Sequence, residues 1–212
     1  LQQLKEADRM KNDLLSIISH ELRIPLTVIQ EGVNLLEEGA LGQINTDQKE
    51  FLGTVDQNVK RLKRLMDKVL MATQVIIGGL DYKFVLTDLV ALLTELKESY
   101  QSMAEAKEVS LELVGVSQVH SWVVDPNKLK AALGQLVENG IQATPAKGRV
   151  SISLTVLGEQ VELQVVDTGV GIPEENIDGI FDQFRSVGGI HDRKTGGLGL
   201  GMFTARSLIE QH

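Results

Sequence analysis

The chain has 212 residues, enough for one large domain or two small ones. Its 21 lysines and arginines and 29 aspartates and glutamates give a formal net charge of −8, without a long basic run. This balance argues against a protein dedicated to duplex DNA, because such proteins gather basic side chains against phosphates. We therefore expect no nucleic-acid partner.

The composition also limits the chemistry. The sequence contains no cysteine, which excludes disulfides, thiolate zinc sites and cysteine nucleophiles and favours a reducing compartment. No apolar run reaches the roughly 20 residues that span a bilayer, so we expect no membrane contact by this fragment. Because the sequence opens within a helical pattern, we expect it to be part of a longer chain.

Residues 1–77 carry a helical pattern with a single proline. Apolar residues at helical spacing form two neighbouring stripes in the first part of this region. The first stripe consists of Leu15, Ile18, Leu22, Leu26, Ile29, Val33 and Leu36, and the second of Ala7, Met10, Leu14, Ile17, Ile24 and Val28. A break over residues 38–45 precedes a second helix, with Thr46 as its predicted N-cap. Along that helix, apolar residues repeat every seven positions at Val55, Leu62, Val69 and Ile76.

These stripes predict an all-α antiparallel helical hairpin over residues 1–77. Two helices cannot cover apolar faces of this width. The simplest arrangement that buries them is a homodimer in which four helices share one bundle core. Gly78 and Gly79 are expected to end the second helix, and residues 78–83 to form a linker.

Residues 84–212 have a different pattern, in which short alternating segments and helical segments follow one another. Strands are expected at residues 83–86, 110–116, 121–124, 149–157 and 160–166, and helices at residues 89–107, at 126–143 and from 200 onward. This order predicts a second domain of the α+β class, with a mixed sheet and helices on one face.

His20 lies on a polar ridge of the first helix. Its neighbours on the ridge are Asp13, Ser16, Arg23 and Thr27. Glu21 can orient the imidazole or accept its proton, which makes the other ring nitrogen a nucleophile near neutral pH. Pro25 removes the amide that would bond the Glu21 carbonyl and predicts a bend just past His20. The ridge alone leaves open the alternative of a surface histidine without a function.

The segment around this histidine resembles the phosphoacceptor box of sensor histidine kinases, which usually has the order Ser-His-Glu-Leu-Arg-Thr-Pro-Leu. Its residues here are Ser19-His20-Glu21-Leu22-Arg23-Ile24-Pro25-Leu26-Thr27. Further blocks are similar to those of the same family and follow in the same order. They are Gln135-Leu136-Val137-Glu138-Asn139-Gly140-Ile141-Gln142-Ala143-Thr144, Asp167-Thr168-Gly169-Val170-Gly171-Ile172-Pro173, Phe181-Asp182-Gln183-Phe184 and Gly196-Gly197-Leu198-Gly199-Leu200-Gly201.

The resemblance implies a nucleotide site built from these blocks. Asn139 would offer its amide oxygen to Mg²⁺, which prefers oxygen ligands. Asp167 would accept the adenine amino group, with Gly169 and Gly171 allowing a close backbone approach. Taken alone, the first block is equally compatible with an amphipathic helix that carries one polar residue, and the second with a tight turn.

The resemblance also assigns the later blocks. The glycines that would present backbone amides to the phosphates are Gly197, Gly199 and Gly201. Phe181 and Phe184 would anchor a lid over residues 185–195. In that lid, Arg193 and Lys194 would contribute phosphate contacts, although a solvated charge cluster is the simpler alternative.

Together these features imply a protein-histidine kinase of two-component signalling. It would phosphorylate itself on His20 with ATP and Mg²⁺, with Glu21 managing the imidazole proton, and pass the phosphoryl group to an aspartate of a response-regulator receiver domain. The implied fold is a dimeric four-helix bundle followed by an α+β ATP-binding sandwich. The implied location is the cytoplasm, as part of a longer sensor whose upstream part can carry a membrane anchor.

Departures from the family pattern keep two alternatives open. ATP-hydrolysing clamps of the gyrase and Hsp90 type share this nucleotide fold, but Gln135 stands where they place a glutamate that activates water. A dimeric scaffold with weak or no nucleotide binding is suggested by Gln142 and Ala143, where the family commonly has a basic and an aromatic residue. We also expect the sequence to be truncated before the last strand of the sheet.

A further departure is Ile24, four residues after the histidine. Many members of the family carry Thr or Asn there, where the side chain is thought to position the water that dephosphorylates the regulator. Because Ile24 has no donor or acceptor, the resemblance implies little phosphatase activity by this route.

Overall fold

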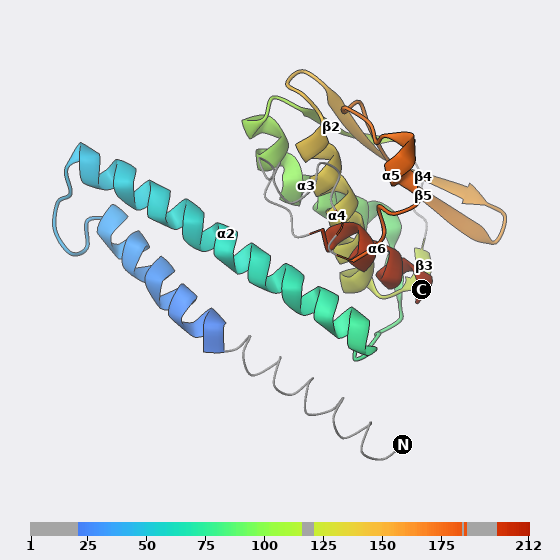
Figure 1. The fold of residues 1–212 in the computed structure, drawn as a ribbon, viewed down its shortest axis with the longest axis horizontal. Coiled ribbons are helices and arrows are strands. Elements are labelled where there is room, and N and C mark those ends of the chain that lie inside the picture. Colours follow the sequence, from blue (N-terminus) through green and yellow to red (C-terminus); the bar gives the residue numbers. More distant parts are fainter. Residues whose placement is uncertain (1–20, 116–120, 184, 186–198) are drawn as a thin grey trace, which may run out of the picture. The chain divides into compact units, whose positions relative to one another are not determined.

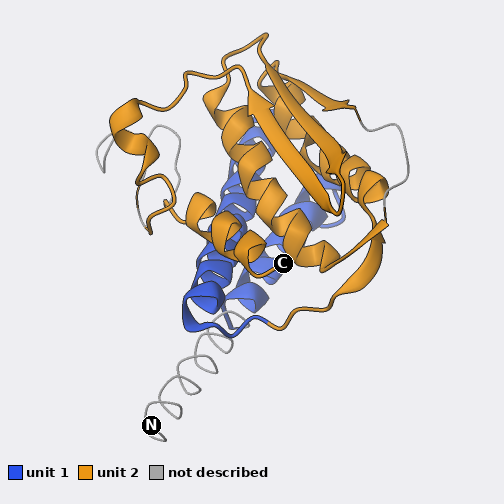
Figure 2. Ribbon diagram, turned by 90° about the vertical axis from the view of Figure 1, so that its right-hand side faces the viewer, with its two compact units in different colours: residues 1–80 blue, residues 81–212 orange. Residues whose placement is uncertain are grey.

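The computed structural model describes residues 21–115, 121–183, 185 and 199–212. The chain divides into two compact units, Leu1–Leu80 and Asp81–His212, which Figure 2 shows in blue and orange. Among the described residues, no helix is long and apolar enough to cross a membrane.

The described part of the first unit consists of a helix over residues 21–37 and the longer helix α2 (Thr46–Ile77). The cap of α2 corrects the sequence prediction, because the N-cap is Asn45 rather than Thr46. The Gln48 N–H donates to Asn45 Oδ1 at 2.8 Å and the Asn45 N–H donates to Gln48 Oε1 at 2.9 Å, which forms a reciprocal capping box. At the other end, Gly78 closes α2 with φ at 70°, the left-handed conformation that glycine adopts readily.

The two helices of the first unit are antiparallel and lie side by side (Figure 1). Arg23 pairs with Asp67 at 3.1 Å, and seven residues later Gln30 donates to Asp56. The partner number falls as the first helix advances, which fixes the opposite directions of the helices. The predicted hairpin is therefore confirmed over the described residues.

The second unit alternates strands and helices. Its elements are β1 (Val85–Asp88), α3 (Leu89–Ala106), β2 (Ser110–Val114), β3 (Ser121–Val124), α4 (Pro126–Ala143), β4 (Arg149–Leu157), β5 (Gln160–Asp167), α5 (Glu174–Ile177) and α6 (Gly201–Glu210). The first strand begins two residues later than predicted, and the second ends two residues earlier.

The strands of the second unit form two sheets. β1 pairs with β3 in antiparallel register, and a three-stranded sheet has the order β2-β4-β5. In the larger sheet, β2 is parallel to β4 whereas β5 is antiparallel to it. The predicted mixed sheet is therefore confirmed.

The core of the second unit lies between the three-stranded sheet and the helices α3 and α4. Along β4, every second residue is buried from Val150 to Leu154, so only one face of the strand is covered. The helices contribute Leu89, Leu92, Leu93, Leu96, Leu129, Leu133, Val137 and Ile141 to the same cluster. This one-sided packing places α4 against β4 and β5, and it thereby fixes where the residues at the end of β5 meet the helix.

Candidate functional site

The block around Asn139 (residues 135–144), called here the asparagine block, lies at the end of α4, a helix that begins at a buried cap. Asp125 is 3% exposed, and its Oδ1 accepts the backbone N–H groups of Asn127 and Lys128, each at 3.0 Å. Burial opposes ionisation of Asp125, but hydrogen bonds from the backbone N–H groups of Lys83, Lys128 and Asn127 outweigh it and lower the pKa of this carboxyl. Asn139 lies in the last part of α4 with its side chain exposed.

Asp167 is the last residue of β5, where it pairs in register with Val150. Its side chain is exposed, and its Oδ1 accepts the N–H of Gly169 at 2.8 Å. This bond orients the carboxylate while the second oxygen makes no hydrogen bond to the described residues. An acceptor of this kind suits an amino group of a bound ligand.

Glycines bring Asp167 and the asparagine block together. A Cβ added at Gly140, the residue after Asn139, would lie 3.5 Å from the Cβ of Asp167. A Cβ at Gly169 would lie 2.9 Å from the carbonyl carbon and oxygen of Ala143, closer than side chains pack. The Val170 N–H also donates to the Ala143 carbonyl at 3.3 Å. The loop after β5 therefore rests on the end of α4, a contact that needs glycine at position 169.

Gly171 has a positive φ of 73°, which requires a residue without a Cβ or a strained one. The two glycines of this block thus have different local functions. Gly169 permits a close approach to α4, and Gly171 permits the turn that leads away from the strand.

Two residues that support this loop were not predicted from the sequence. Thr168 Oγ1 accepts the N–H of Arg149 at 2.9 Å and ties the loop to the start of β4. Lys107, at the end of α3, donates from Nζ to the carbonyl of Ile141 at 2.9 Å and also to that of Gln142. Since the last turn of α4 contains no basic residue, Lys107 provides the cation that the carbonyl end of the helix favours.

The glycine block comprises residues 196–201, and its described part, residues 199–201, lies at the start of α6. Gly199 has φ at 67°, and Gly201 is the first residue of the helix. A Cβ at Gly201 would lie 2.7 Å from Gln135 Oε1, so the start of α6 packs on α4 one turn before Asn139. The side chain of Gln135 is engaged in this contact.

Phe181 packs on the same helix. The guanidinium carbon of Arg206 lies 5.6 Å from the centre of its ring, a cation–π contact. Arg206 also bonds Glu210 at 2.6 Å, and this hydrogen bond raises the pKa of the guanidinium. These residues, with Asp182, Gln183, Phe203 and Ser207, line a shallow pocket on α6.

Several predicted site residues fall outside the described part of the chain. These are His20, Phe184, Arg193, Lys194 and Gly197. Glu21 is the first described residue of the first helix and is exposed, and the helix continues through Pro25. The structure thus places Asp167 and Gly169 against the end of α4 that carries Asn139, and Gly201 against α4 one turn earlier.

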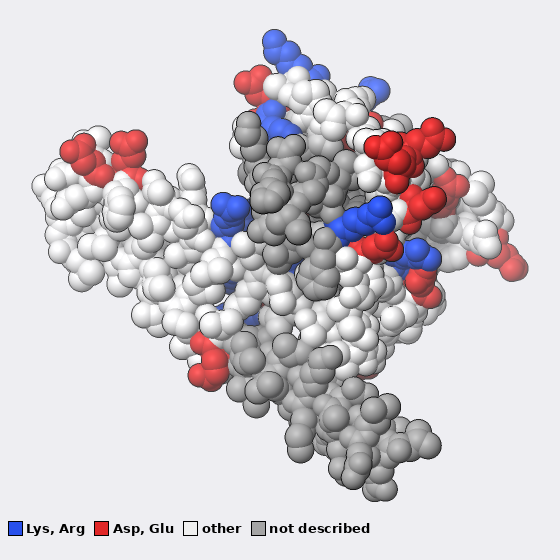
Figure 3. All heavy atoms as spheres, viewed as in Figure 1, with Lys and Arg blue, Asp and Glu red and all other residues white. Residues whose placement is uncertain are grey.

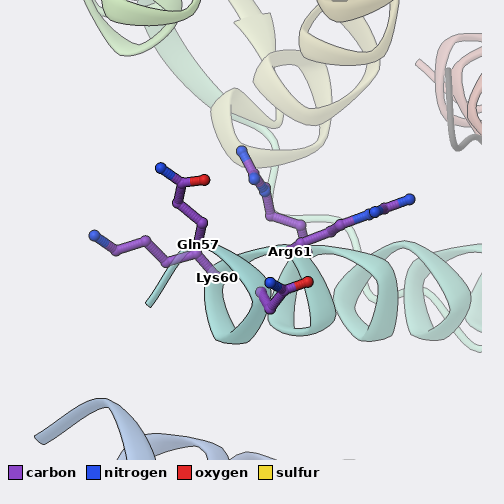
Figure 4. A pocket seen from close by; sticks show the side chains of 5 residues that line it. Gln57, Lys60 and Arg61 are labelled. Atoms are coloured by element: carbon purple, nitrogen blue, oxygen red, sulfur yellow. The ribbon is translucent and has the colours of Figure 1, made fainter. Parts of the chain in front are cut away.

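On the face shown in Figure 3, acidic and basic side chains are interspersed. A separate pocket on α2 is lined by Gln57, Asn58, Lys60, Arg61 and Arg64, and Figure 4 shows these side chains extending from the helix, with Gln57, Lys60 and Arg61 labelled. None of the predicted site residues lines it. Among the described residues, no group of three or more histidines, aspartates and glutamates could hold a metal ion.

Two family models match the chain in the order of its two units. The His Kinase A (phospho-acceptor) domain matches residues 10–75, and the histidine kinase-, DNA gyrase B- and HSP90-like ATPase domain matches residues 124–212. Sensor protein SrrB of Staphylococcus aureus is 28% identical over 205 residues, which cover 97% of this chain and 35% of the relative. The chain belongs to the sensor histidine kinase family. It spans about a third of the length of this relative.

Solved structures of histidine kinases have a similar fold. Full-length ShkA, solved in complex with AMPPNP, has a TM-score of 0.74 at 23% identity, over 92% of this chain and 40% of that one. The catalytic domain of histidine kinase ThkA has a TM-score of 0.51 at 27% identity, over 61% of this chain and 81% of that one. The first similarity extends over both units.

Proposed function

We propose that this histidine kinase uses ATP to phosphorylate His20 and then transfers the phosphoryl group to an aspartate of a response-regulator receiver domain. The observation that carries the proposal is the junction of Asp167 with the end of α4, next to Asn139. A hydrogen-bond acceptor for a base and an oxygen ligand for a phosphate-bound cation are both needed to hold a nucleotide. Both are available here on adjoining elements.

Asp167 would recognise the adenine. Its Oδ1 is held by the Gly169 N–H, which leaves Oδ2 to accept the exocyclic amino group of the base. Gly171 and the start of α6 at Gly199 and Gly201 would allow the nucleotide to approach the backbone closely. ShkA, solved with the nucleotide AMPPNP, supports a nucleotide site in this fold.

The donor set fits Mg²⁺ carried by a triphosphate better than a cation held by the protein alone. Asn139 is exposed and can contribute one amide oxygen, while the described residues contain no carboxylate cluster for a metal. When bound, Mg²⁺ would neutralise negative charge on the phosphate oxygens. We assign Asn139 as its protein ligand.

His20 would be the nucleophile. A ring nitrogen forms a bond to the γ-phosphorus, the bond from that phosphorus to the β–γ bridging oxygen breaks, and ADP leaves. Glu21 would accept the proton of the other ring nitrogen. Transfer to a carboxylate of the regulator then breaks the phosphorus–nitrogen bond and restores the histidine. We place this activity in the cytoplasm and in a homodimer.

Incubation of the chain with γ-labelled ATP and Mg²⁺ tests the proposal. We expect label that is stable in alkali and lost in acid, as for a phosphorus–nitrogen bond. His20→Gln should abolish this label without reducing helix content or ATP affinity, because the sequence pattern predicts His20 on a polar ridge outside the apolar stripes. Acid-labile label on the His20→Gln chain would contradict the assignment, and absence of ATP binding by the unaltered chain would favour the scaffold alternative.

A further inference from the structure

Two helices of the second unit begin with an aspartate cap, and the two caps differ at their second carboxylate oxygen. Asp88 caps α3, where its Oδ1 accepts the N–H groups of Val90 at 2.8 Å and Ala91 at 3.1 Å. Asp125 caps α4 in the same way with its own Oδ1. Asp125 is buried at 3% exposure, whereas Asp88 is half-buried. A cap alone does not require a carboxylate to be buried.

The second oxygen of Asp125 accounts for the difference. Its Oδ2 accepts the backbone N–H of Lys83 at 2.8 Å, whereas Oδ2 of Asp88 makes no hydrogen bond to the described residues. Lys83 lies in the segment that leads from α2 into β1. One oxygen of Asp125 therefore caps α4, and the other holds the chain where it enters the second unit.

The residues on either side of Lys83 are held as well. The rings of Tyr82 and Phe84 stack with their centres 5.7 Å apart, and both meet the edge of the His212 ring, at 5.4 and 5.6 Å. His212 Nδ1 lies 2.7 Å from the carbonyl of Leu208, in the last turn of α6. The entering segment is thus fixed to the start of α4 and to the end of α6, close to the C-terminal end marked in Figure 1.

These two helices are the ones that carry the proposed nucleotide site. α4 bears Asn139 towards its far end, and α6 begins in the glycine block. The linker from the histidine-bearing unit is therefore anchored on the helices that would hold ATP. In-line transfer to His20 depends on the mutual orientation of the nucleotide and the histidine. A linker that moves at this anchor would therefore lower the rate of phosphoryl transfer.

We propose that Asp125 is a positioning residue for phosphoryl transfer, because its Oδ2 fixes the point at which the linker enters the nucleotide-binding unit. The inference rests on the proposed function. The inference separates the rate of phosphoryl transfer from the affinity for nucleotide. The anchor would act on the transfer step, whereas Asn139 and Asp167 would act on nucleotide binding.

Asp125→Asn separates the two oxygens. Asparagine is as good an N-cap as aspartate and keeps Oδ1 as the acceptor for the first turn of α4. Its amide nitrogen is a donor, however, and cannot accept the N–H of Lys83. Asp125→Ser is a second variant, because serine also caps a helix but is too short to bond both groups. Asp88→Asn is the matched control, with the same change of charge at a cap that holds no linker.

The first measurement is amide hydrogen exchange in the full 212-residue chain. In Asp125→Asn we expect protection of the Lys83 N–H to fall by about tenfold, the effect of losing one hydrogen bond to a charged group. The N–H groups of Asn127 and Lys128 should keep their protection. Loss of protection at those two amides instead would show that the cap had failed. In that case the same measurements on Asp125→Ser, which caps α4 without bonding Lys83, test the inference.

The second measurement compares ATP affinity with the rate of His20 labelling at saturating ATP. Asp125→Asn should leave the Kd for ATP unchanged and lower the labelling rate by about tenfold, whereas Asp88→Asn should change neither. An unchanged or faster labelling rate, or an equal loss in the control, would overturn the inference alone. Failure of the unaltered chain to label His20 would overturn the proposed function as well.

Discussion

The two units of this chain bury their apolar residues to very different extents. In the second unit, Leu93, Val137 and Ile152 are completely buried. In the first unit, three of the four residues of the seven-residue repeat on α2 are exposed, with Leu62 at 53%, Val69 at 40% and Ile76 at 45% exposure. The second unit therefore has a core of its own, whereas the described residues of the first unit leave an apolar face of α2 exposed.

This difference matches the work that each unit would do. In the proposed site, Asp167 and Asn139 would have to be held in fixed geometry, and α4 is held because it packs on the sheet through a closed core. We propose that the apolar face of the first unit pairs with a second copy of itself, since a two-fold axis would bring the repeats of four helices together. Exposed apolar residues along a regular heptad repeat therefore indicate assembly with another chain, whereas single exposed polar residues at a strand end indicate a bound ligand.

The largest predicted effect is on the dimer. Leu62→Glu places a carboxylate in the middle of the exposed repeat, and burial of an unpaired charge costs several kcal/mol. We expect the dimer dissociation constant to rise by more than about 100-fold, as measured by light scattering at micromolar concentration. Arg64→Glu, an exposed change on the same helix, is the control and should leave the dimer intact.

Unaltered protein that is monomeric at micromolar concentration would contradict the dimer directly. A dimer that survives Leu62→Glu would place the interface on another face. In either case the second unit should keep its thermal transition, because its core does not depend on the repeat.

The next effect is on nucleotide binding. Asp167→Asn keeps an acceptor for the Gly169 N–H but replaces the charged acceptor for the adenine amino group, so we expect ATP affinity to fall by about 1.5–3 kcal/mol in titration calorimetry. Glu162→Gln removes a charge from an exposed position on the same strand and should have no effect. Equal affinities for the Asp167→Asn and unaltered chains would mean that the base binds elsewhere.

Much of the fold could be predicted because its signals are local. Apolar periodicity located α3, α4 and the hairpin of β4 and β5, and glycine marked the end of α2. The cap of α2 was misplaced by one residue because Asn45 and Thr46 are both good capping residues, and only the reciprocal bond with Gln48 decides between them.

The contacts that assemble the site could not be predicted because they join distant parts of the chain. Lys107 reaches carbonyls at positions 141 and 142, and Asp125 bonds Lys83 across 42 residues. Neither pair has a spacing that a helix or strand imposes. The sequence could identify Asp125 as a helix start, but its second oxygen found a partner only through the tertiary fold.

The smallest predicted effect concerns Ile24, which is 48% exposed on the first helix. A sec-butyl side chain cannot hold a water by hydrogen bonding, and its β-branching leaves it few rotamers. If the chain acts on a phosphorylated regulator, we expect kinase and phosphotransfer activity with little phosphatase activity. Ile24→Thr should raise the phosphatase rate several-fold, because its hydroxyl can orient a water, while its similar shape preserves the helix.

The assay is the decay of a phosphorylated receiver domain with ADP, in the presence and absence of the protein. Ile24→Val is the matched control, since it is β-branched like threonine but lacks the hydroxyl, and it should leave the decay unchanged. A gain in both variants would trace the effect to side-chain size rather than to the hydroxyl. Rapid dephosphorylation by the unaltered chain, with no gain from Ile24→Thr, would mean that another group positions the water. Ile24 would then only extend the apolar stripe of the first helix.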